Sequence, residues 1–203
     1  MNLFLDIISP LPEFVVIDYN KIILSKKILE TKGDILSDNI ISCYQNLNKK
    51  LNLDKNLKNI IVTIGPGSYT SLRVGIAFVR GIQLSKNIKI ACISIEDQYN
   101  YLSLKTKDSK FGIYIISANQ QKFFCYKFKN KFIHLKIDSN NFKIPNNIKK
   151  MYCNEKCKEV FMQNLIIKTF DLKKDLIEYL YKINFSKNMI IKPIYISNNK
   201  ILN

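Results

Sequence analysis

Hydrophobic and polar positions alternate along the chain in two patterns, and together they predict a layered α/β protein. Short apolar or alternating runs predict a meander of three strands over residues 3–8, 14–18 and 22–29. Apolar residues at helical spacing, with acids early and lysines late, then predict a helix over 34–50. The remaining expected elements are a strand over 60–64, a helix over 71–86, a strand over 89–93 and a helix from 94 toward 104. Parallel strands joined by helical crossovers after an antiparallel meander are typical of a ribonuclease H-like lobe.

A similar series of elements begins again after a polar stretch at residues 105–110. The expected elements are strands over 111–117, 122–128 and 132–137, a loop around 140–147, and helices through 155–164 and over 171–183. We therefore expect an α/β fold of two ribonuclease H-like lobes, the plan of the actin, Hsp70 and sugar kinase (ASKHA) group. The expected division is 1–106 for the first lobe and 107–203 for a second, reduced lobe.

The turn before the helix over 71–86 contains Gly65, Pro66 and Gly67. A turn of this kind can present free backbone N–H groups at a positive helix end, where an anion or a partner's carboxylate binds, although it is more often only a tight connection. It lacks the Gly-Lys-Ser/Thr ending of a P-loop. Thr70 is the expected N-cap, and we interpret the hydroxyls of Ser68 and Thr70 as helix caps rather than nucleophiles, because the sequence offers no nearby base.

The helix over 71–86 contains two glycines, each of which costs about 1 kcal/mol relative to alanine. Contact with another helix offsets that cost, and two rows of small residues favour contact with the sheet on one side and a partner on the other. Arg73 lies in the first turn, where a cation opposes the helix dipole, so we expect an anion to answer it. The expected partner-facing residues of this helix and of the helix over 34–50 are Leu36, Ile40, Tyr44, Ser71, Leu72, Gly75, Phe78 and Val79.

Composition limits the classes of protein that the sequence permits. The chain has 203 residues, 47% of them hydrophobic, which is enough for a core of one large domain or two lobes. It carries five scattered cysteines and lacks an apolar run long enough for a membrane span, and we expect a cytoplasmic protein with reduced thiols. Cys153 and Cys157 share a face if that segment is helical, but no second pair completes a zinc site.

The net charge of +16 is concentrated in the second half of the chain. Residues 1–104 carry a net charge of +3 and residues 105–203 carry +13. Such a surplus fits RNA nearby, and it fits equally a compositional drift toward lysine, since only Arg73 and Arg80 accompany the 30 lysines.

Catalytic and nucleotide-binding groups are sparse in this sequence. In ATP-binding proteins of this fold group, a glycine-containing turn after the first strand wraps the phosphates. Here that turn is Ser9-Pro-Leu-Pro12, which lacks two N–H donors. Asp6 is then either a vestigial phosphate or metal site or a structural residue. His134 is the only histidine of the chain. No metal site and no catalytic residue are expected.

The string Gly65-Pro-Gly-Ser-Tyr-Thr-Ser-Leu-Arg73 resembles the GPGSFTGLR signature of the TsaB (YeaZ) family of tRNA threonylcarbamoyladenosine biosynthesis. Tyr69 stands where phenylalanine is usual, and Ser71 replaces a glycine. The segments 93–96, 118–124 and 192–196 are similar to the family's Val-Ser-Ser-Leu-Glu, Asp-Ala-Arg-x-Gly-Glu-Val-Tyr and Pro-Val-Tyr-Leu motifs, with Ser117 in place of the aspartate.

This resemblance implies a non-catalytic scaffold subunit. Such proteins pair with TsaD through their first two helices, and TsaE, an ATPase, docks on the pair. TsaD then transfers the threonylcarbamoyl group from threonylcarbamoyl-adenylate to the adenosine beside the anticodon in tRNAs that read codons starting with A. The resemblance also implies that ATP and threonylcarbamoyl-adenylate bind to the partner subunits, and that the chain contacts tRNA as part of the complex. An isolated copy can form a homodimer.

Two other functions remain open from the residues alone. The fold group includes small-molecule kinases, which bind ATP between the lobes. The basic second half is also compatible with a free-standing RNA-binding module.

Overall fold

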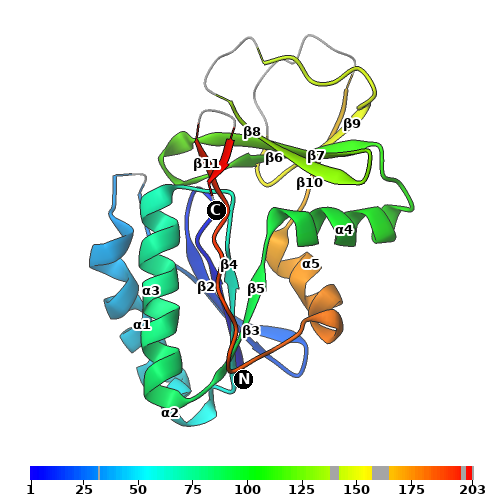
Figure 1. Ribbon diagram of the computed structural model, residues 1–203. Coiled ribbons are helices and arrows are strands. Elements are labelled where there is room, and N and C mark those ends of the chain that lie inside the picture. Colours follow the sequence, from blue (N-terminus) through cyan, green and yellow to red (C-terminus); the bar gives the residue numbers. More distant parts are fainter. Residues whose placement is uncertain (32, 138–141, 157–164, 198–199, 203) are drawn as a thin grey trace.

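The computed structural model describes the chain except residues 32, 138–141, 157–164, 198–199 and 203. Its first lobe is built on a five-stranded mixed sheet in the order β3-β2-β1-β4-β5 (Figure 1). Strands β1, β2 and β3 are antiparallel neighbours, whereas β4 pairs parallel to β1 and β5 parallel to β4. The strands are β1 (Asn2–Asp6), β2 (Glu13–Asp18), β3 (Lys21–Lys27), β4 (Asn59–Thr63) and β5 (Lys89–Ile93).

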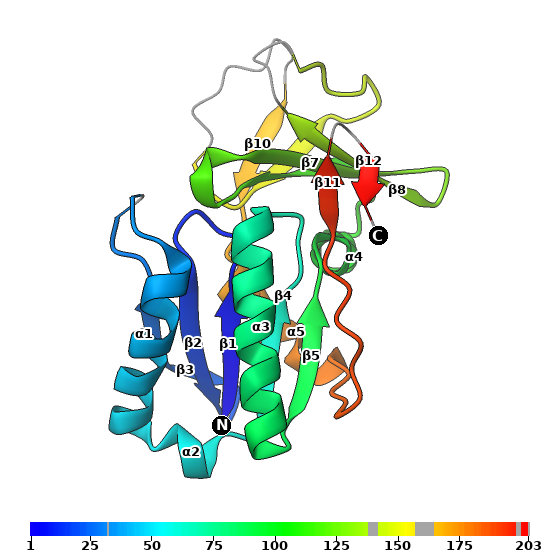
Figure 2. The same ribbon diagram turned by 60° about the vertical axis from the view of Figure 1, so that its left-hand side comes forward.

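Helices cover both faces of this first sheet. One face is covered by α1 (Leu36–Leu51), the short α2 (Leu53–Asn56) and α3 (Tyr69–Lys86), and their apolar side chains join the inward residues of the strands in one core. The other face meets α4 (Ile95–Thr106), which lies under the second sheet, and α5 (Leu172–Tyr179), which lies behind the strands of the first sheet (Figure 2). A single cluster of buried residues therefore connects the two lobes.

The second lobe repeats the beginning of the first. Its mixed five-stranded sheet has the order β10-β9-β6-β7-β8, with β6, β7 and β8 forming the antiparallel meander and β9 and β10 added in parallel. The strands are β6 (Phe111–Ile116), β7 (Lys122–Phe128), β8 (Lys131–Ile137), β9 (Lys150–Cys153) and β10 (Ile166–Thr169). The expected pair of ribonuclease H-like lobes is confirmed.

The C-terminal segment returns from the second lobe to the first. After α5 and a 3₁₀ turn at Leu180–Lys182, it runs beside the first sheet, where Ser186 pairs with Ile90 and the Ile194 N–H donates to the Ile64 carbonyl at 2.7 Å. It ends in the hairpin of β11 (Tyr195–Ser197) and β12 (Lys200–Leu202), which contacts β8. The last part of the chain therefore packs on both lobes.

Several expectations for the second lobe need correction. Strands β9 and β10 were not anticipated, and the 171–183 helix ends at Tyr179. Cys153 is the last residue of β9, so it is not on a helix with Cys157, and Cys157 itself lies outside the described residues. The helix expected through 155–164 lies almost wholly outside them, and residues 155–156 are not helical.

None of the helices within the described residues combines the length and apolar character needed to cross a membrane.

Candidate functional site

The loop that joins β4 to α3 is packed on both sides by its own chain. Gly65 has a positive φ of 112°, and a Cβ added there would lie 2.6 Å from the Ile194 carbonyl oxygen. A Cβ on Gly67 would lie 3.2 Å from Cγ2 of Ile8. The Gly65 carbonyl accepts from the Ile95 N–H at 3.1 Å, which ties the loop to α4. The glycines therefore allow close packing against the end of β1 and the C-terminal segment.

Helix α3 begins earlier than the sequence predicted. Its first residue is Tyr69 and its N-cap is Ser68, whose hydroxyl makes no capping hydrogen bond, although its carbonyl accepts from the Leu72 N–H at 3.0 Å. The expected N-cap role of Thr70 is therefore wrong: Thr70 is an exposed residue of the first turn. Thr70 cannot cap the helix because the backbone turns into it two residues sooner, and the Ser68 hydroxyl makes no capping bond although Ser68 is the N-cap.

Most residues expected to face a partner lie instead in the core of the first lobe. Gly75 marks the inward side of α3, since a Cβ there would approach two carbons of the Ile7 side chain to 2.7 Å. Phe78 is only partly buried and packs on Phe14 and Tyr44 with ring centroids 5.6 and 5.4 Å away. The buried members of the set are Leu36, Ile40, Tyr44, Ser71, Leu72, Gly75 and Val79.

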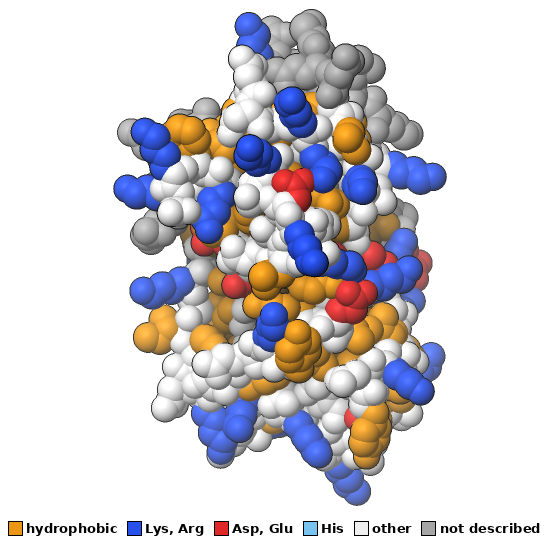
Figure 3. Space-filling view, turned by 90° about the vertical axis from the view of Figure 1, so that its right-hand side faces the viewer, with side chains coloured by type: hydrophobic (Ala, Val, Ile, Leu, Met, Phe, Trp, Pro, Cys, Tyr) orange, Lys and Arg blue, Asp and Glu red, His pale blue; other side chains and the backbone are white. Residues whose placement is uncertain are grey.

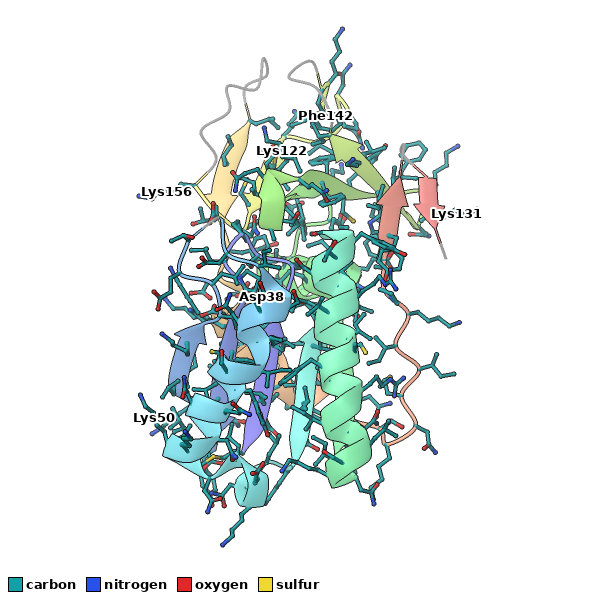
Figure 4. The ribbon with its side chains drawn as sticks, turned by 90° about the vertical axis from the view of Figure 1, so that its left-hand side faces the viewer. Asp38, Lys50, Lys122, Lys131, Phe142 and Lys156 are labelled. Atoms are coloured by element: carbon teal, nitrogen blue, oxygen red, sulfur yellow. The ribbon has the colours of Figure 1, made fainter. Side chains whose placement is uncertain are left out.

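The outward side of α1 and α3 carries a different set of side chains. The two helices lie side by side, with Asp38 and Lys50 at opposite ends of α1 (Figure 4). Ala77 and Gly81 are exposed on α3, and a Cβ on Gly81 would find nothing within 4 Å. Leu84 on α3 is 84% exposed and Ile41 on α1 is 57% exposed. The sequence identified the two helices, but the surface that a partner can reach consists of these outward positions.

Arg73 is exposed at the beginning of α3 and stacks on an aromatic pair. Its guanidinium carbon lies 5.3 Å from the ring centroid of Tyr69, which in turn lies 4.8 Å from the ring of Tyr195 on β11. Among the residues that the structure describes, no carboxylate forms a salt bridge with Arg73. Within the described residues a cation–π contact takes the place of an anion in the fold, and an anion supplied across an interface stays a prediction. The role of Tyr195 was missed because it lies far away in the sequence.

Asp6 is held by hydrogen bonds inside the turn that follows β1. Its carboxylate accepts from the N–H groups of Ile8 and Ser9 at 3.0 and 3.2 Å, from the Ser9 hydroxyl at 2.5 Å, and from the Thr63 hydroxyl at 3.4 Å. Burial raises the pKa of this carboxyl, and the hydrogen bonds partly oppose that shift. Asp6 therefore shapes the turn, and within the described residues it joins no cluster of metal-ligating side chains.

A polar cluster with a buried side, formed by Gln98 and Asp175, and an exposed side, formed by Lys105 and Glu178, links α4 to α5. The Gln98 side chain donates to Asp175 at 2.7 Å, and the Lys105 ammonium contacts Asp175 at 3.2 Å and Glu178 at 2.9 Å. The Tyr101 hydroxyl also donates to Glu178. Burial raises the pKa of Asp175, whereas the Tyr101 hydrogen bond is the main cause of a lowered pKa at Glu178. The sequence offered no signal for this cluster, because its members come from opposite lobes.

A second polar contact joins α4 to the second sheet. Nε2 of His134 on β8 lies 2.7 Å from Oε1 of Glu96, and the imidazole is fully buried. Nδ1 has no hydrogen-bond partner, so the ring is held on one side only. The only histidine of the chain thus sits in the contact between lobes.

The C-terminal segment borders an open hollow of about 480 Å³ beside the end of α3. Arg80 spans it by donating to the Gln83 side chain at 2.6 Å and to the Met189 carbonyl, and Gln83 donates to the Lys187 carbonyl at 2.7 Å. Both α3 side chains therefore fasten the returning segment to the first lobe.

The fold and this geometry define a class of protein: two ribonuclease H-like lobes in which the turn after β1 is closed by prolines and Asp6, and the glycine loop positions α3. A comparison with known families gives a match over residues 31–140, more than half of the chain, to TsaD, described as tRNA N6-adenosine threonylcarbamoyltransferase. The chain belongs to this family, which places it in the tRNA threonylcarbamoyl modification system.

Solved structures extend the similarity to nearly the whole chain. YeaZ from Pseudomonas aeruginosa superposes with a TM-score of 0.57 at 12% identity, covering 89% of this chain and 90% of that one. A protein described as uncharacterized, with similarity to peptidase YEAZ from Pseudomonas aeruginosa, gives 0.54 at 11% identity with the same coverage. No curated protein sequence matches. The chain is thus TsaB/YeaZ-like in fold, as its glycine loop predicted.

Proposed function

We propose that this chain is a non-catalytic partner subunit that pairs with TsaD through the outward surface of α1 and α3. In this proposal the pair recruits TsaE, and TsaD carries out threonylcarbamoylation of the adenosine beside the anticodon in tRNAs that read codons starting with A. ATP and threonylcarbamoyl-adenylate bind to the partner subunits. An isolated copy uses the same surface to form a homodimer.

The outward surface of α3 is the observation that carries this proposal. Ala77 and Gly81 leave a low, exposed strip that another helix can approach closely, and the exposed side chains of Leu84 on α3 and Ile41 on α1 supply apolar area for burial on association. The inward glycine, Gly75, is explained by packing on Ile7, but nothing within the described chain requires a glycine at position 81.

Co-purification of the tagged chain with TsaD tests the pairing. We expect Gly81→Arg to abolish the complex, because the added side chain has open space in the free protein but would fill the strip that the partner helix needs. Asn100→Arg on α4 is the matched control, since that position is also exposed and helical but lies outside the surface. An unchanged complex with Gly81→Arg would show that the pairing surface is elsewhere.

A kinase activity of the same fold group is less well supported. The Ser9–Pro12 turn has buried prolines at positions 10 and 12, and Asp6 already accepts four hydrogen bonds. Calorimetry separates the two functions: tight magnesium-dependent ATP binding by the isolated chain would favour the kinase. Depletion of the protein should lower threonylcarbamoyladenosine in bulk tRNA if the subunit function is correct.

A further inference from the structure

The tip of the β7–β8 hairpin exposes an aromatic side chain surrounded by lysines. The turn residues Lys129 and Asn130 have φ values of 46° and 63°, which closes a tight hairpin at the free end of the meander. Phe128 is 49% exposed and lies directly across from Lys131. The ammonium of Lys129 lies 5.6 Å from the Phe128 ring centroid, and that of Lys127 lies 5.4 Å from the Phe132 ring.

Phe128 lies beyond the core that accounts for the other rings on its face of the sheet. Side chains two residues apart on a strand share a face, so Phe124, Tyr126 and Phe128 form a row. Phe124 is fully buried and Tyr126 packs beside the same core, with their ring centroids 5.7 Å apart. The row continues to Phe128, where no core covers half of the ring. Packing in this lobe therefore does not explain an aromatic residue at the tip.

Positive charge at the tip is not balanced by acids on the hairpin. Between Ser109 and Ile137 the sequence contains no aspartate or glutamate. Lys127, Lys129 and Lys131 form no salt bridge with any described residue, in contrast to Lys105, Lys150 and Lys173 in the same half of the chain. Lys131 points away from the body of the molecule beside the β11–β12 hairpin (Figure 4). On the face shown in Figure 3, lysine and arginine side chains are spread over the upper part of the molecule with few acids among them.

We propose that the tip of the β7–β8 hairpin is an RNA-binding surface that contacts tRNA. The Phe128 ring stacks on an unpaired base, and Lys129 and Lys131 neutralise the phosphates on either side of it. Lys127, on the opposite face of the hairpin beside Phe132, adds to the positive charge at the tip. Stacking needs an exposed ring, which the hairpin provides, and it tolerates any base because every base has a flat π face. The lysines supply the attraction to the backbone through counterion release. The choice of tRNA among RNAs rests on the proposed function, whereas RNA binding by the hairpin does not.

The chemistry of the tip favours RNA over an anionic membrane. Phe128 is the exposed large apolar side chain of this hairpin among the described residues, and one ring gives little area for burial in lipid. A single ring between cations does match a base flanked by phosphates.

Fluorescence anisotropy with a labelled tRNA anticodon stem-loop, titrated with the full chain at several salt concentrations, tests the proposal. We expect Phe128→Ala to weaken binding about fivefold or more at every salt concentration, and Phe128→Tyr to restore it. The triple variant Lys127→Gln, Lys129→Gln, Lys131→Gln should reduce the slope of log K against log salt by about 2, at about 0.7 for each phosphate contact in a single strand.

A matched triple variant controls for the general positive charge. Lys49→Gln, Lys50→Gln and Lys55→Gln remove the same charge from exposed positions of α1 and α2 in the first lobe, and should leave most of the slope unchanged. An equal effect of the two triple variants, a neutral Phe128→Ala, or stronger binding to vesicles with anionic lipid than to the stem-loop would each overturn the proposal. Equal affinity for an oligouridylate of the same length would overturn the assignment to tRNA.

The outcome is separable from the pairing with TsaD. Phe128→Ala should leave co-purification with TsaD intact, because the tip is distant in the fold from the outward surface of α3, and Gly81→Arg should leave binding of the isolated chain to the stem-loop intact. If Phe128→Ala weakens binding to the stem-loop but Gly81→Arg leaves the TsaD complex unchanged, only the pairing surface is wrong. The reverse pair of results would overturn only the RNA-binding proposal.

Discussion

The two helical glycines of α3 make a prediction about stability that can be worked out from their surroundings. Gly75 and Gly81 lie on the same helix, yet a Cβ at position 75 would come within 2.7 Å of two carbons of Ile7, and a Cβ at position 81 would meet nothing within 4 Å. Replacing each by alanine adds the same methyl group to both sites. Gly81→Ala should therefore raise the free energy of unfolding, whereas Gly75→Ala should not.

The magnitudes follow from helix propensity and packing. Alanine is favoured over glycine within a helix by about 1 kcal/mol, so Gly81→Ala should stabilise the protein by about that amount. At position 75 the same gain is opposed by overpacking against the fully buried Ile7, which typically costs about 1–3 kcal/mol. We expect Gly75→Ala to be neutral or to destabilise by up to about 2 kcal/mol.

Urea unfolding of the two variants and the parent protein measures the difference. Ile7→Val removes one of the two carbons that the new methyl group would contact, so it should cost less stability in the Gly75→Ala background than in the parent. Equal stabilisation by the two alanine variants, or strict additivity with Ile7→Val, would refute the packing argument. If the argument holds, a larger side chain at Gly75 disturbs folding, and Gly81 is the position at which an interface can be tested.

Three further predictions concern polar groups. Arg80→Ala should increase amide hydrogen exchange in residues 186–194, since it removes the hydrogen bond from the guanidinium to the Met189 carbonyl; unchanged protection would show that this bond does not hold the segment. Because the pKa of Asp6 is raised in the folded protein, ionisation of this carboxyl opposes folding. Its contribution to stability is therefore greatest at a pH below 3.8, the ordinary pKa of the group, and is lost as the pH rises through the raised pKa. Asp6→Asn should therefore cost less stability at neutral pH than at about pH 4 in pH-dependent urea unfolding, and a cost that grows with pH would contradict this. Glu96→Ala leaves both ring nitrogens of the buried His134 without a partner and should destabilise the folded protein by about 1–3 kcal/mol, whereas Glu96→Gln should retain the contact. Equal thermal unfolding of the two variants would show that the contact with His134 does not stabilise the fold.

The periodicity of the sequence predicted elements that are fixed by local pattern. Strand β5 and the capping box of α4 match the prediction, because Ser94 and Asp97 lie three residues apart and satisfy each other's backbone N–H groups. Strands β9 and β10 were missed because four-residue strands carry little periodic signal. Local spacing also identified α1 and α3 as elements of interest, but spacing alone could not distinguish the side of α3 that faces Ile7 from the side that is open.

Contacts between distant parts of the chain decide how the glycine loop is used. The sequence left two interpretations of Gly65 and Gly67, a tight connection or a turn that exposes N–H groups to an anion. The structure places Ile194 against one glycine and Ile8 against the other, which favours the tight connection. Ile194 is separated from Gly65 by most of the second lobe in sequence, so no local pattern could reveal that contact. Arg80 and the backbone bond to Ile64 attach the C-terminal segment to the first lobe, and the segment in turn packs against the glycine loop that precedes α3. The loop, the returning segment and α3 therefore form one packed unit, in which changes that loosen the segment should also disturb the surface of α3.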